Sequence, residues 1–367
     1  MPAGRKVRPA AEPNRFDEGG IAVINSLGES AARNAPGVIL SAAVAFAAVA
    51  AEPLMKRLTG GLALPAMVIA LFMGIAFNRL AADPRFAPGI GWCVKKLLRI
   101  AIGLLGLRIA LGDILALGLG TIALVVISMA ATLAASIWLA KFFGREAGYG
   151  ALAGAANAVC GASATLAASA VVPAYKTKDA DTAFTVVMAN AVSTLVMLAY
   201  PPLCLWLGLS AQETGVMLGA SIHDMAQVVG AGYAVSEQAG NTSVVVKLFR
   251  VFLLLPVVLA IGWWFTKRGG TAGEAKVPPP VFAIVFLLLA LLNTAVLSAP
   301  ALLPAYLPVK AAIGEASRWG LLLAIAALGL GTSLSAMLAV GWRHAAVFMG
   351  ATAAILVLVT GGIFLLR

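Results

Sequence analysis

Apolar runs long enough to cross a membrane follow one another along the chain from Gly37 to the C-terminus. A helix needs roughly 17–25 apolar residues to cross the hydrocarbon core of a bilayer. The runs cover 37–51, 62–80, 97–118, 119–143, 148–173, 181–208, 212–235, 244–266, 281–300, 316–340 and 341–366. This pattern predicts an all-α polytopic membrane protein with about 10–11 transmembrane segments.

The polar residues separate a short tail from one long membrane region. Residues 1–36 are polar and predict an N-terminal cytoplasmic tail without a cleavable signal peptide. The only Pro/Gly-rich loop, 268–280, is too short to separate domains. We therefore expect residues 37–367 to form a single transmembrane domain.

Composition and the positions of the charges support this assignment. The chain is 61% hydrophobic and 11% charged, whereas a soluble domain has roughly a quarter charged residues. If the N-terminus is cytoplasmic and every segment crosses once, most of the 26 Lys and Arg lie in cytoplasmic loops, with Lys176 and Lys178 among the exceptions outside. The net charge of +11 then indicates topology and contact with anionic lipid, and not a nucleic-acid partner.

Metal and cofactor chemistry find little support. The three cysteines are far apart, and two histidines are too few for a His-rich cluster. The pattern therefore favours neither a metal site nor a disulfide framework, and no cofactor is expected.

One internal similarity suggests a duplication. "AIGLLGLRIALGDILALG" (101–118) and "AIAALGLGTSLSAMLAVG" (324–341) align without gaps. An odd number of segments separates the two copies, so they should cross the membrane in opposite directions. This is the arrangement of inverted-repeat transporters.

Two segments differ from the ordinary Leu/Val/Ala helices: "GALAGAANAVCGASATLAASAVV" (150–172) and "GVMLGASIHDMAQVVGAGYAV" (215–235). Each begins with G-x-x-x-G, which lets another backbone approach closely, and then reaches polar residues beside another glycine. Interrupted backbone at membrane depth is tolerated only where protein or a watery cavity satisfies its polar groups. We expect two broken helices around a polar cavity, and the pattern leaves open whether they span or re-enter.

The first broken segment offers polar atoms at one place. Asn157, Cys160 and Ser163 would share one face if the region were helical. If the helix restarts after Gly161, Ser163 becomes its N-cap and the free amides of Gly161–Ser163 can hold an anion. Ser163 could also simply bond its own backbone, and Cys160 is more typical of a packing residue than of a nucleophile.

The second broken segment adds ionisable groups. Ser221 and Asp224 stand in an S-x-x-D order that resembles a capping box, with Gly219 and Ser221 offering further amides and a hydroxyl. An ionisable residue within a span is read as functional by default, so Asp224 with His223 is a candidate coupling pair; its alternative is a capping role alone. Gln227 is either a ligand or interhelical glue.

Two cations follow in "VVVKLFRVFLLLP" (244–256). Lys247 and Arg250 are three residues apart and share one helical face. They either extend their side chains to the membrane interface or provide a positive lining for the path of an anion.

Three ordered motifs carry a family resemblance: "CGASA" (160–164), "GASIHDMAQVVGAG" (219–232) and "VVKLFRVFLLLPVVL" (245–259). In these the chain resembles the bacterial YeiH-type family of sulfate exporters. The resemblance implies inverted repeats, a scaffold, and a core with two crossed broken helices, as in sodium/proton antiporters and bile-acid symporters. The motif positions are Cys160, Gly161, Ser163, His223, Asp224, Gln227, Lys247 and Arg250.

These observations predict a secondary transporter of a small anion, such as sulfate or a related sulfur oxyanion, in the bacterial inner membrane. A proton or sodium ion is the expected coupling partner, and a homodimer is left open. The alternatives are transport of an organic acid and cation/proton exchange. An intramembrane enzyme is disfavoured, because the chain lacks G-x-S-x-G and H-E-x-x-H.

Overall fold

The computed structural model describes residues 15–58, 66–109, 112, 115, 117–269, 279–331 and 342–367. Within these ranges the chain forms helices and no strand, which confirms the all-α prediction. Six helices are long and apolar enough to cross a membrane; they cover 32–55, 118–142, 178–206, 237–266, 300–330 and 342–366.

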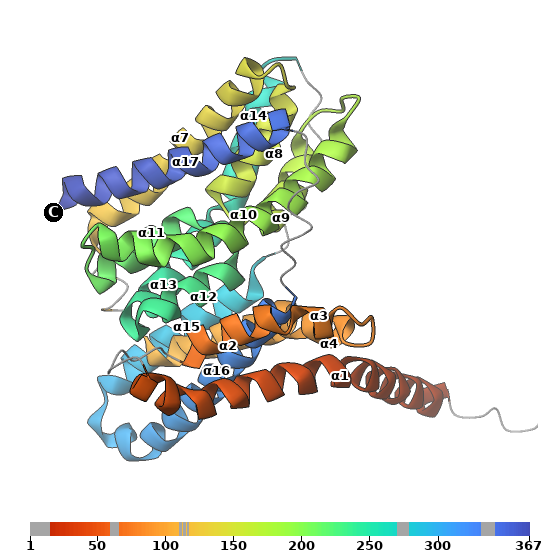
Figure 1. Ribbon diagram of the computed structural model, residues 1–367, viewed down its shortest axis with the longest axis vertical. Coiled ribbons are helices and arrows are strands. Elements are labelled where there is room, and N and C mark those ends of the chain that lie inside the picture. Colours follow the sequence, from red (N-terminus) through yellow and green to blue (C-terminus); the bar gives the residue numbers. More distant parts are fainter. Residues whose placement is uncertain are drawn as a thin grey trace, which may run out of the picture.

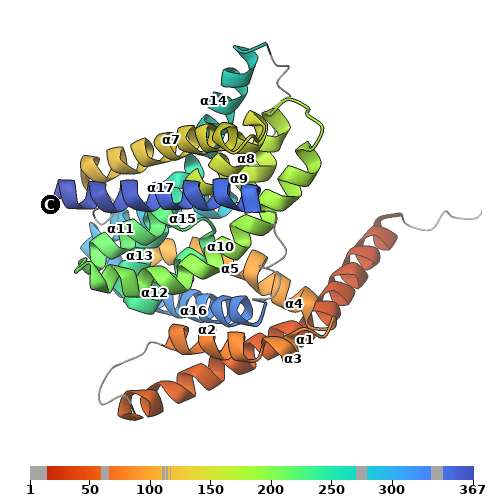
Figure 2. The same cartoon turned by 45° about the horizontal axis from the view of Figure 1, so that its top comes forward.

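One group of helices combines the N-terminal part of the described sequence with residues 281–330 (Figures 1 and 2). Its N-terminal members are α1 (Arg15–Leu58), α2 (Ala66–Ala76), α3 (Asn78–Ala81), α4 (Ala87–Trp92), a π-helical turn (Cys93–Leu97), α5 (Leu98–Leu105) and the 3-10 turn η2 (Gly106–Arg108). Its later members are α15 (Val281–Leu297), the 3-10 turn η3 (Pro300–Leu302) and α16 (Leu303–Leu330). Close backbone approach joins them, since a Cβ on Gly74 of α2 would lie 2.9 Å from the Cα of Gly329 of α16.

The second group contains the two broken segments. It comprises α7 (Gly118–Phe142), α8 (Ala147–Ala158), α9 (Ala162–Val171), α10 (Lys178–Trp206), α11 (Ala211–Ser221), α12 (Met225–Val235), α13 (Glu237–Phe252), α14 (Leu254–Thr266) and α17 (Trp342–Leu366). Figures 1 and 2 both place α11, α12 and α13 between the α7–α17 pair and the α1–α2–α16 helices.

Large apolar side chains cover the outside of these helices. Leu119 is 83% exposed, Leu205 71% and Val357 68%. A soluble protein rarely exposes contiguous apolar surface on this scale, so these faces are suited to lipid. The outward apolar faces and the long apolar helices together make this a multi-pass membrane protein.

Helices α7 and α17 run in opposite directions. A Cβ on Gly120, near the start of α7, would lie 2.9 Å from Leu366 at the end of α17. At the other end, the rings of Phe143 and Trp342 are 6.2 Å apart. The two helices follow the duplicated sequences, so their directions agree with the expected inverted repeat. Much of the second copy, 332–341, lies outside the described residues.

The first broken segment folds back as a hairpin, here called hairpin 1 (α8–α9, 147–171). A Cβ on Gly148, at the start of α8, would touch Tyr175 and Val172, which follow the end of α9. The hairpin therefore enters and leaves at the same end of the molecule. We call this the Lys141 end, because Lys141 lies in the last turn of α7, just before the hairpin.

The second broken segment forms hairpin 2 (α11–α12, 211–235), which enters from the opposite end. A Cβ on Gly215, near the start of α11, would contact Thr242 of α13, and one on Gly232, near the end of α12, would contact Ser243 beside it. Both ends of hairpin 2 thus lie at the start of α13. We call this the Glu213 end, after the residue in the first turn of α11.

The hairpins resolve the question that the sequence left open, since the two broken segments re-enter and do not span. They are not single helices that cross the membrane. This geometry also moves Lys176 and Lys178 to the Lys141 end, because hairpin 1 returns there before α10 begins. The excess of positive charge at that end is therefore larger than the single-crossing interpretation gives.

The close-approach prediction from the G-x-x-x-G spacing is confirmed in both hairpins. A Cβ on Gly150 would lie 2.7 Å from the Cα of Ile137 on α7, and one on Gly219 would lie 2.5 Å from the carbonyl oxygen of Ser243 on α13. Each hairpin is thereby packed directly on the backbone of a long neighbouring helix.

Helices α1 and α16 begin well before the apolar runs predict. Helix α1 starts at Arg15, inside the stretch interpreted as a polar tail, and α16 starts at Leu303 and not at 316. The prolines of α16 explain the second difference. Pro304 occupies the first turn, where its missing N–H is harmless, and Pro308 follows within the helix.

The last residue of the described chain attaches α17 to hairpin 2. Arg367 Nε lies 2.6 Å from Glu213 Oε1, and its Nη2 donates to the carbonyl of Gly208. The hydrogen bond from the Arg367 guanidinium lowers the pKa of the Glu213 carboxyl from 4.5 to about 2. The ionised carboxylate therefore contributes stability above its ordinary pKa, and this contribution is lost as the pH falls through the lowered value.

We expect the Glu213→Gln variant to melt about 1–3 °C below the wild type near neutral pH. The difference should shrink between about pH 4.5 and pH 2, because over that range the carboxyl takes up a proton in the unfolded wild type but stays ionised in the folded one. Melting of the two purified proteins in detergent at several pH values checks this. A gap that stays constant down to the lowest pH would show that the ion pair is not its cause.

Candidate solute site at the hairpin tips

The tips of the two hairpins meet inside the molecule. Hairpin 1 turns at Val159–Gly161, and hairpin 2 turns at Ile222–Asp224. A Cβ on Gly161 would lie 3.8 Å from His223. Two segments that are distant in sequence thus come into contact. One tip reaches this point from the Lys141 end and the other from the Glu213 end.

Lys247 and Arg250 of α13 bind both tips at once. Lys247 Nζ donates to the carbonyls of Val159 (2.6 Å) and Ile222 (2.7 Å). The Arg250 guanidinium donates to further carbonyls on both hairpins: Asn157 (2.5 Å), Ala158 (3.0 Å), Gly219 (3.0 Å) and Ile222 (3.2 Å). Each cation therefore joins the end of α8 to the end of α11.

These bonds have a simple physical cause. The last carbonyls of a helix have no intrahelical partner, and the C-terminal end carries partial negative charge. Lys247 and Arg250 supply donors and positive charge where α8 and α11 end. Both side chains are completely buried, so the alternative that they extend to the membrane interface is wrong. Among the described carboxylates, none is hydrogen-bonded to either cation.

The second helix of hairpin 1 starts two residues earlier than the capping prediction requires. Gly161 has φ of +63°, and α9 begins at Ala162. Ser163 is therefore the second residue of α9, not its N-cap, and that prediction is wrong. The glycine conformation alone makes the turn, so no side chain is needed to cap it.

On hairpin 2 the capping residue is Asp224. Its carboxylate accepts from the amide of Ala226, and its own amide donates to Ser193 Oγ on α10. Ser221 ends α11 and donates its hydroxyl to the carbonyl of Met217, so the predicted capping box between Ser221 and Asp224 is wrong. A helix break separates the two residues.

The amides predicted to hold an anion must be reassigned for the same reason. Gly219 and Ser221 lie in the last turn of α11, where amides bond within the helix and carbonyls are free. The free amides of hairpin 2 belong to the first turn of α12. On hairpin 1 they belong to the first turn of α9, and the amide of Gly161 is not among them because it donates to the carbonyl of Ala156.

A buried polar chain connects the tips to α17. His223 Nε2 is 3.1 Å from Thr352 Oγ1, which is 2.8 Å from Asn157 Oδ1 and 3.0 Å from the carbonyl of Phe348. A hydroxyl has one proton and these latter partners are acceptors, so Nε2 must donate and Nδ1 is left as an acceptor. Within the described structure, neither His223 Nδ1 nor Gln227 Oε1 has a hydrogen-bond partner, although both atoms are buried.

The predicted residues differ in their access to the surroundings. His223, Asn157 and Ser221 are fully buried, and Gln227 is nearly so. Cys160 and Asp224 are half-buried, and Ser163 is exposed. No hydrogen bond joins the His223 and Asp224 side chains, both of which are described. Groups of three or more metal-ligating side chains are likewise missing from the described part of the chain.

Two residues that contact the tips were not predicted from the sequence. Thr352 and Ser193 come from the long apolar helices α17 and α10. Each is an isolated hydroxyl in an apolar run, and such a residue often bonds its own helix backbone. Only the fold shows that Thr352 and Ser193 face the hairpin tips.

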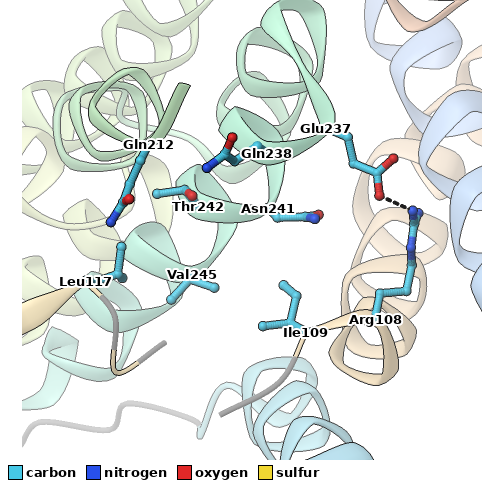
Figure 3. Close-up of a pocket in the computed structure, with 9 residues that line it drawn as sticks. All are labelled: Arg108, Ile109, Leu117, Gln212, Glu237, Gln238, Asn241, Thr242 and Val245. Atoms are coloured by element: carbon cyan, nitrogen blue, oxygen red, sulfur yellow. Dashed lines mark hydrogen bonds and ion pairs between the residues drawn. The ribbon is translucent and has the colours of Figure 1, made fainter. Parts of the chain in front are cut away.

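A separate pocket of about 540 Å³ lies at the Glu213 end (Figure 3). Five of its lining residues come from one face of α13, which begins at Glu237, whereas the predicted apolar run starts only at 244. The sequence signal that could have revealed this part of the helix is the helical spacing of its polar residues. The pocket is lined by Arg108, Ile109, Leu117, Gln212, Glu237, Gln238, Asn241, Thr242 and Val245.

Comparison with known proteins places the chain in a family. Residues 36–348 match the family model described as conserved hypothetical protein 698. The chain is 42% identical to the UPF0324 membrane protein TauZ of Paracoccus pantotrophus over 335 residues, covering 90% of this chain and 95% of that protein. It is 40% identical over 331 residues to a UPF0324 membrane protein of Chlorobaculum tepidum, covering 89% and 88%.

A protein of Rhizobium meliloti named in the same way is 40% identical over 336 residues, covering 90% of this chain and 93% of that protein. No solved structure matches the chain. The matches extend over both hairpins and α13, and they bear out the family resemblance of the three motifs. The chain therefore belongs to the UPF0324 family of membrane proteins.

Proposed function

We propose that this protein is a secondary transporter that moves a small anion, sulfate or a related sulfur oxyanion, across the bacterial inner membrane by alternating access. One observation carries the proposal. Two re-entrant hairpins enter from opposite ends, and their tips meet at two fully buried cations. A site built where discontinuous helices meet midway is typical of secondary transporters.

The charge at the tips favours an anion over a cation. Lys247 and Arg250 are buried without a hydrogen-bonded carboxylate among the described residues, and their partners are neutral carbonyls. The first turns of α9 and α12 add the positive ends of two helix dipoles and N-terminal amides, of which that of Ala226 is already bonded to Asp224. An oxyanion that enters this region would exchange water for these donors.

Asp224 and His223 are the proposed coupling pair. Asp224 stands at the start of α12 and is half-buried, whereas His223 beside it is fully buried with Nδ1 unpaired in the described structure. An ionised Asp224 would repel a dianion, so we propose that it takes up a proton when the anion binds.

The charge distribution supports the orientation. Lys141, Arg145, Lys176 and Lys178 all lie near one end, where hairpin 1 enters. By the positive-inside rule we propose that the Lys141 end faces the cytoplasm, together with the N-terminus.

Transport assays in proteoliposomes test this function. We expect sulfate uptake to saturate with concentration, to show counterflow, and to be accompanied by proton uptake. The Asp224→Asn variant should lose proton coupling, with sulfate-driven proton uptake reduced at least tenfold. Asp83→Asn is the matched control, because Asp83 is an exposed carboxylate paired to Arg85 in a loop.

The outcomes separate the parts of the proposal. Unchanged proton coupling in Asp224→Asn rejects the coupling role alone. Saturable uptake of a carboxylate or of sodium, with none of sulfate, sulfite or thiosulfate, rejects the sulfur oxyanion. Flux without saturation or counterflow rejects a carrier.

A further inference from the structure

The pocket at the Glu213 end is distinct from the hairpin tips. Gln212 lines the pocket near the start of α11, and Ile222 lies at the tip just after its last residue. At a rise of about 1.5 Å per residue, these positions are separated by about 15 Å along the helix. The function proposed above does not use this pocket.

The pocket contains one charge of each sign, and they face each other. Arg108 Nη2 is hydrogen-bonded to Glu237 Oε1, which joins η2 to the start of α13 (Figure 3). The carboxylate side chain is 63% exposed and that of Arg108 is 25% exposed. An ion pair in contact with water is weakly held, so a ligand with matching charges can open it.

Neutral polar groups complete the wall. Tyr233 donates its hydroxyl to Asn241 Oδ1 at 2.6 Å. Because the amide oxygen is engaged there, the NH2 group of Asn241 remains available as a donor on the pocket side. Figure 3 shows the amide ends of Gln212 and Gln238 near the hydroxyl of Thr242 on the opposite side of the hollow.

The remaining lining is apolar. Ile109, Leu117 and Val245 line the lower part of the pocket in Figure 3, with Ile109 next to Arg108 and Leu117 farthest from it. Its volume of about 540 Å³ lies within the range of small-molecule sites, roughly 300–1,000 Å³.

We propose that this pocket binds a small zwitterion, a short organic molecule with an anionic group at one end and an ammonium at the other. The anionic end is bound by Arg108 with the amide donors, and the ammonium by Glu237. The short carbon chain between them packs on the apolar side. A solute carrying a single charge would leave either Glu237 or Arg108 unpaired or facing a like charge, so it binds more weakly.

Equilibrium binding to the purified full-length protein tests the proposal. The probes are glycine, β-alanine and taurine, compared with propionate and ethylamine, which each carry only one of the two charges. We expect at least one zwitterion to bind at least tenfold more tightly than either singly charged probe. Arg108→Gln and Glu237→Gln should each weaken that binding at least tenfold.

A matched control is available elsewhere in the chain. Arg318 and Glu315 form an exposed ion pair on α16 that does not line the pocket, so Arg318→Gln should leave zwitterion binding unchanged. Asp224→Asn should also leave it unchanged, because Asp224 lies at the tips. Loss of transport in Asp224→Asn with intact zwitterion binding therefore bears on the proposed function alone.

Three results would overturn the proposal. The first is that no zwitterion of the set binds. The second is that propionate or ethylamine binds as tightly as the best zwitterion. The third is that Arg108→Gln and Glu237→Gln bind it as well as the wild type, with melting temperatures showing that both variants are folded.

Discussion

Replacing Arg250 by leucine is expected to destabilise this protein more than any other single substitution considered above. The guanidinium donates to four carbonyls, two on each hairpin. The Ile222 carbonyl keeps its bond from Lys247, but the other three lose the donor that Arg250 supplies. An unsatisfied buried acceptor costs about 1–3 kcal/mol, so their combined loss is a large part of a typical stability of about 5–15 kcal/mol. We expect the melting temperature in detergent to fall by about 10 °C or more, or the variant to fail to fold.

Arg250→Lys distinguishes charge from geometry. A lysine keeps the positive charge, but the donors on its one nitrogen cannot cover four separate carbonyls as the spread donors of a planar guanidinium do. We expect its stability to lie between those of the leucine variant and the wild type. Arg318→Leu is the control, since Arg318 is half exposed. An Arg250→Leu protein that melts within about 2 °C of the wild type would contradict the role assigned to these bonds.

Alanine at Gly161 is expected to disrupt the tip of hairpin 1 for a conformational reason. The φ of +63° lies where side chains are strongly disfavoured, and such backbone costs about 1–3 kcal/mol. Space is not the problem, because the nearest atom to the added Cβ would be the Cβ of Ala189 at 3.5 Å. We expect a melting temperature several degrees lower and, because α9 must start differently, at least a tenfold loss of sulfate transport.

Gly91→Ala is the matched control for that substitution. Gly91 is helical, within α4, and nothing lies within 4 Å of the added Cβ. Alanine is favoured over glycine in a helix by about 0.5–1 kcal/mol, so this variant should melt slightly higher and transport normally. If the two variants changed stability equally and in the same direction, strain at Gly161 would not explain the effect.

The positions of the breaks in the two hairpins could be predicted from the sequence, because glycine and polar residues interrupt the apolar runs at 150–172 and 215–235. The direction that the chain takes after each break could not be predicted. A stretch of this length fits either one crossing helix or two short antiparallel helices, and local sequence favours neither. The closeness of Gly148, at the start of hairpin 1, to Tyr175, just after its end, decides between them.

Most residues of the candidate site could be predicted from the sequence, but the contacts that they make could not. The spacing of Lys247 and Arg250 places them on one face, but the carbonyls they bind are about 25 to 93 positions away in sequence. Ser163 and Ser221 had the chemistry of caps, yet the residues that cap α9 and α12 are Gly161 and Asp224, two and three positions away. Thr352 gave no signal, because a single hydroxyl in an apolar helix is ordinary.

By itself, the sequence determined that this is an α-helical membrane protein with two interrupted segments, since hydrophobic length and glycine placement are local properties. The tertiary structure alone decided that the segments re-enter from opposite ends, that their carbonyl ends converge on two buried cations, and that an ion pair lines a separate pocket. These features depend on distant segments meeting, and the energy of such contacts is not encoded at any one position of the chain.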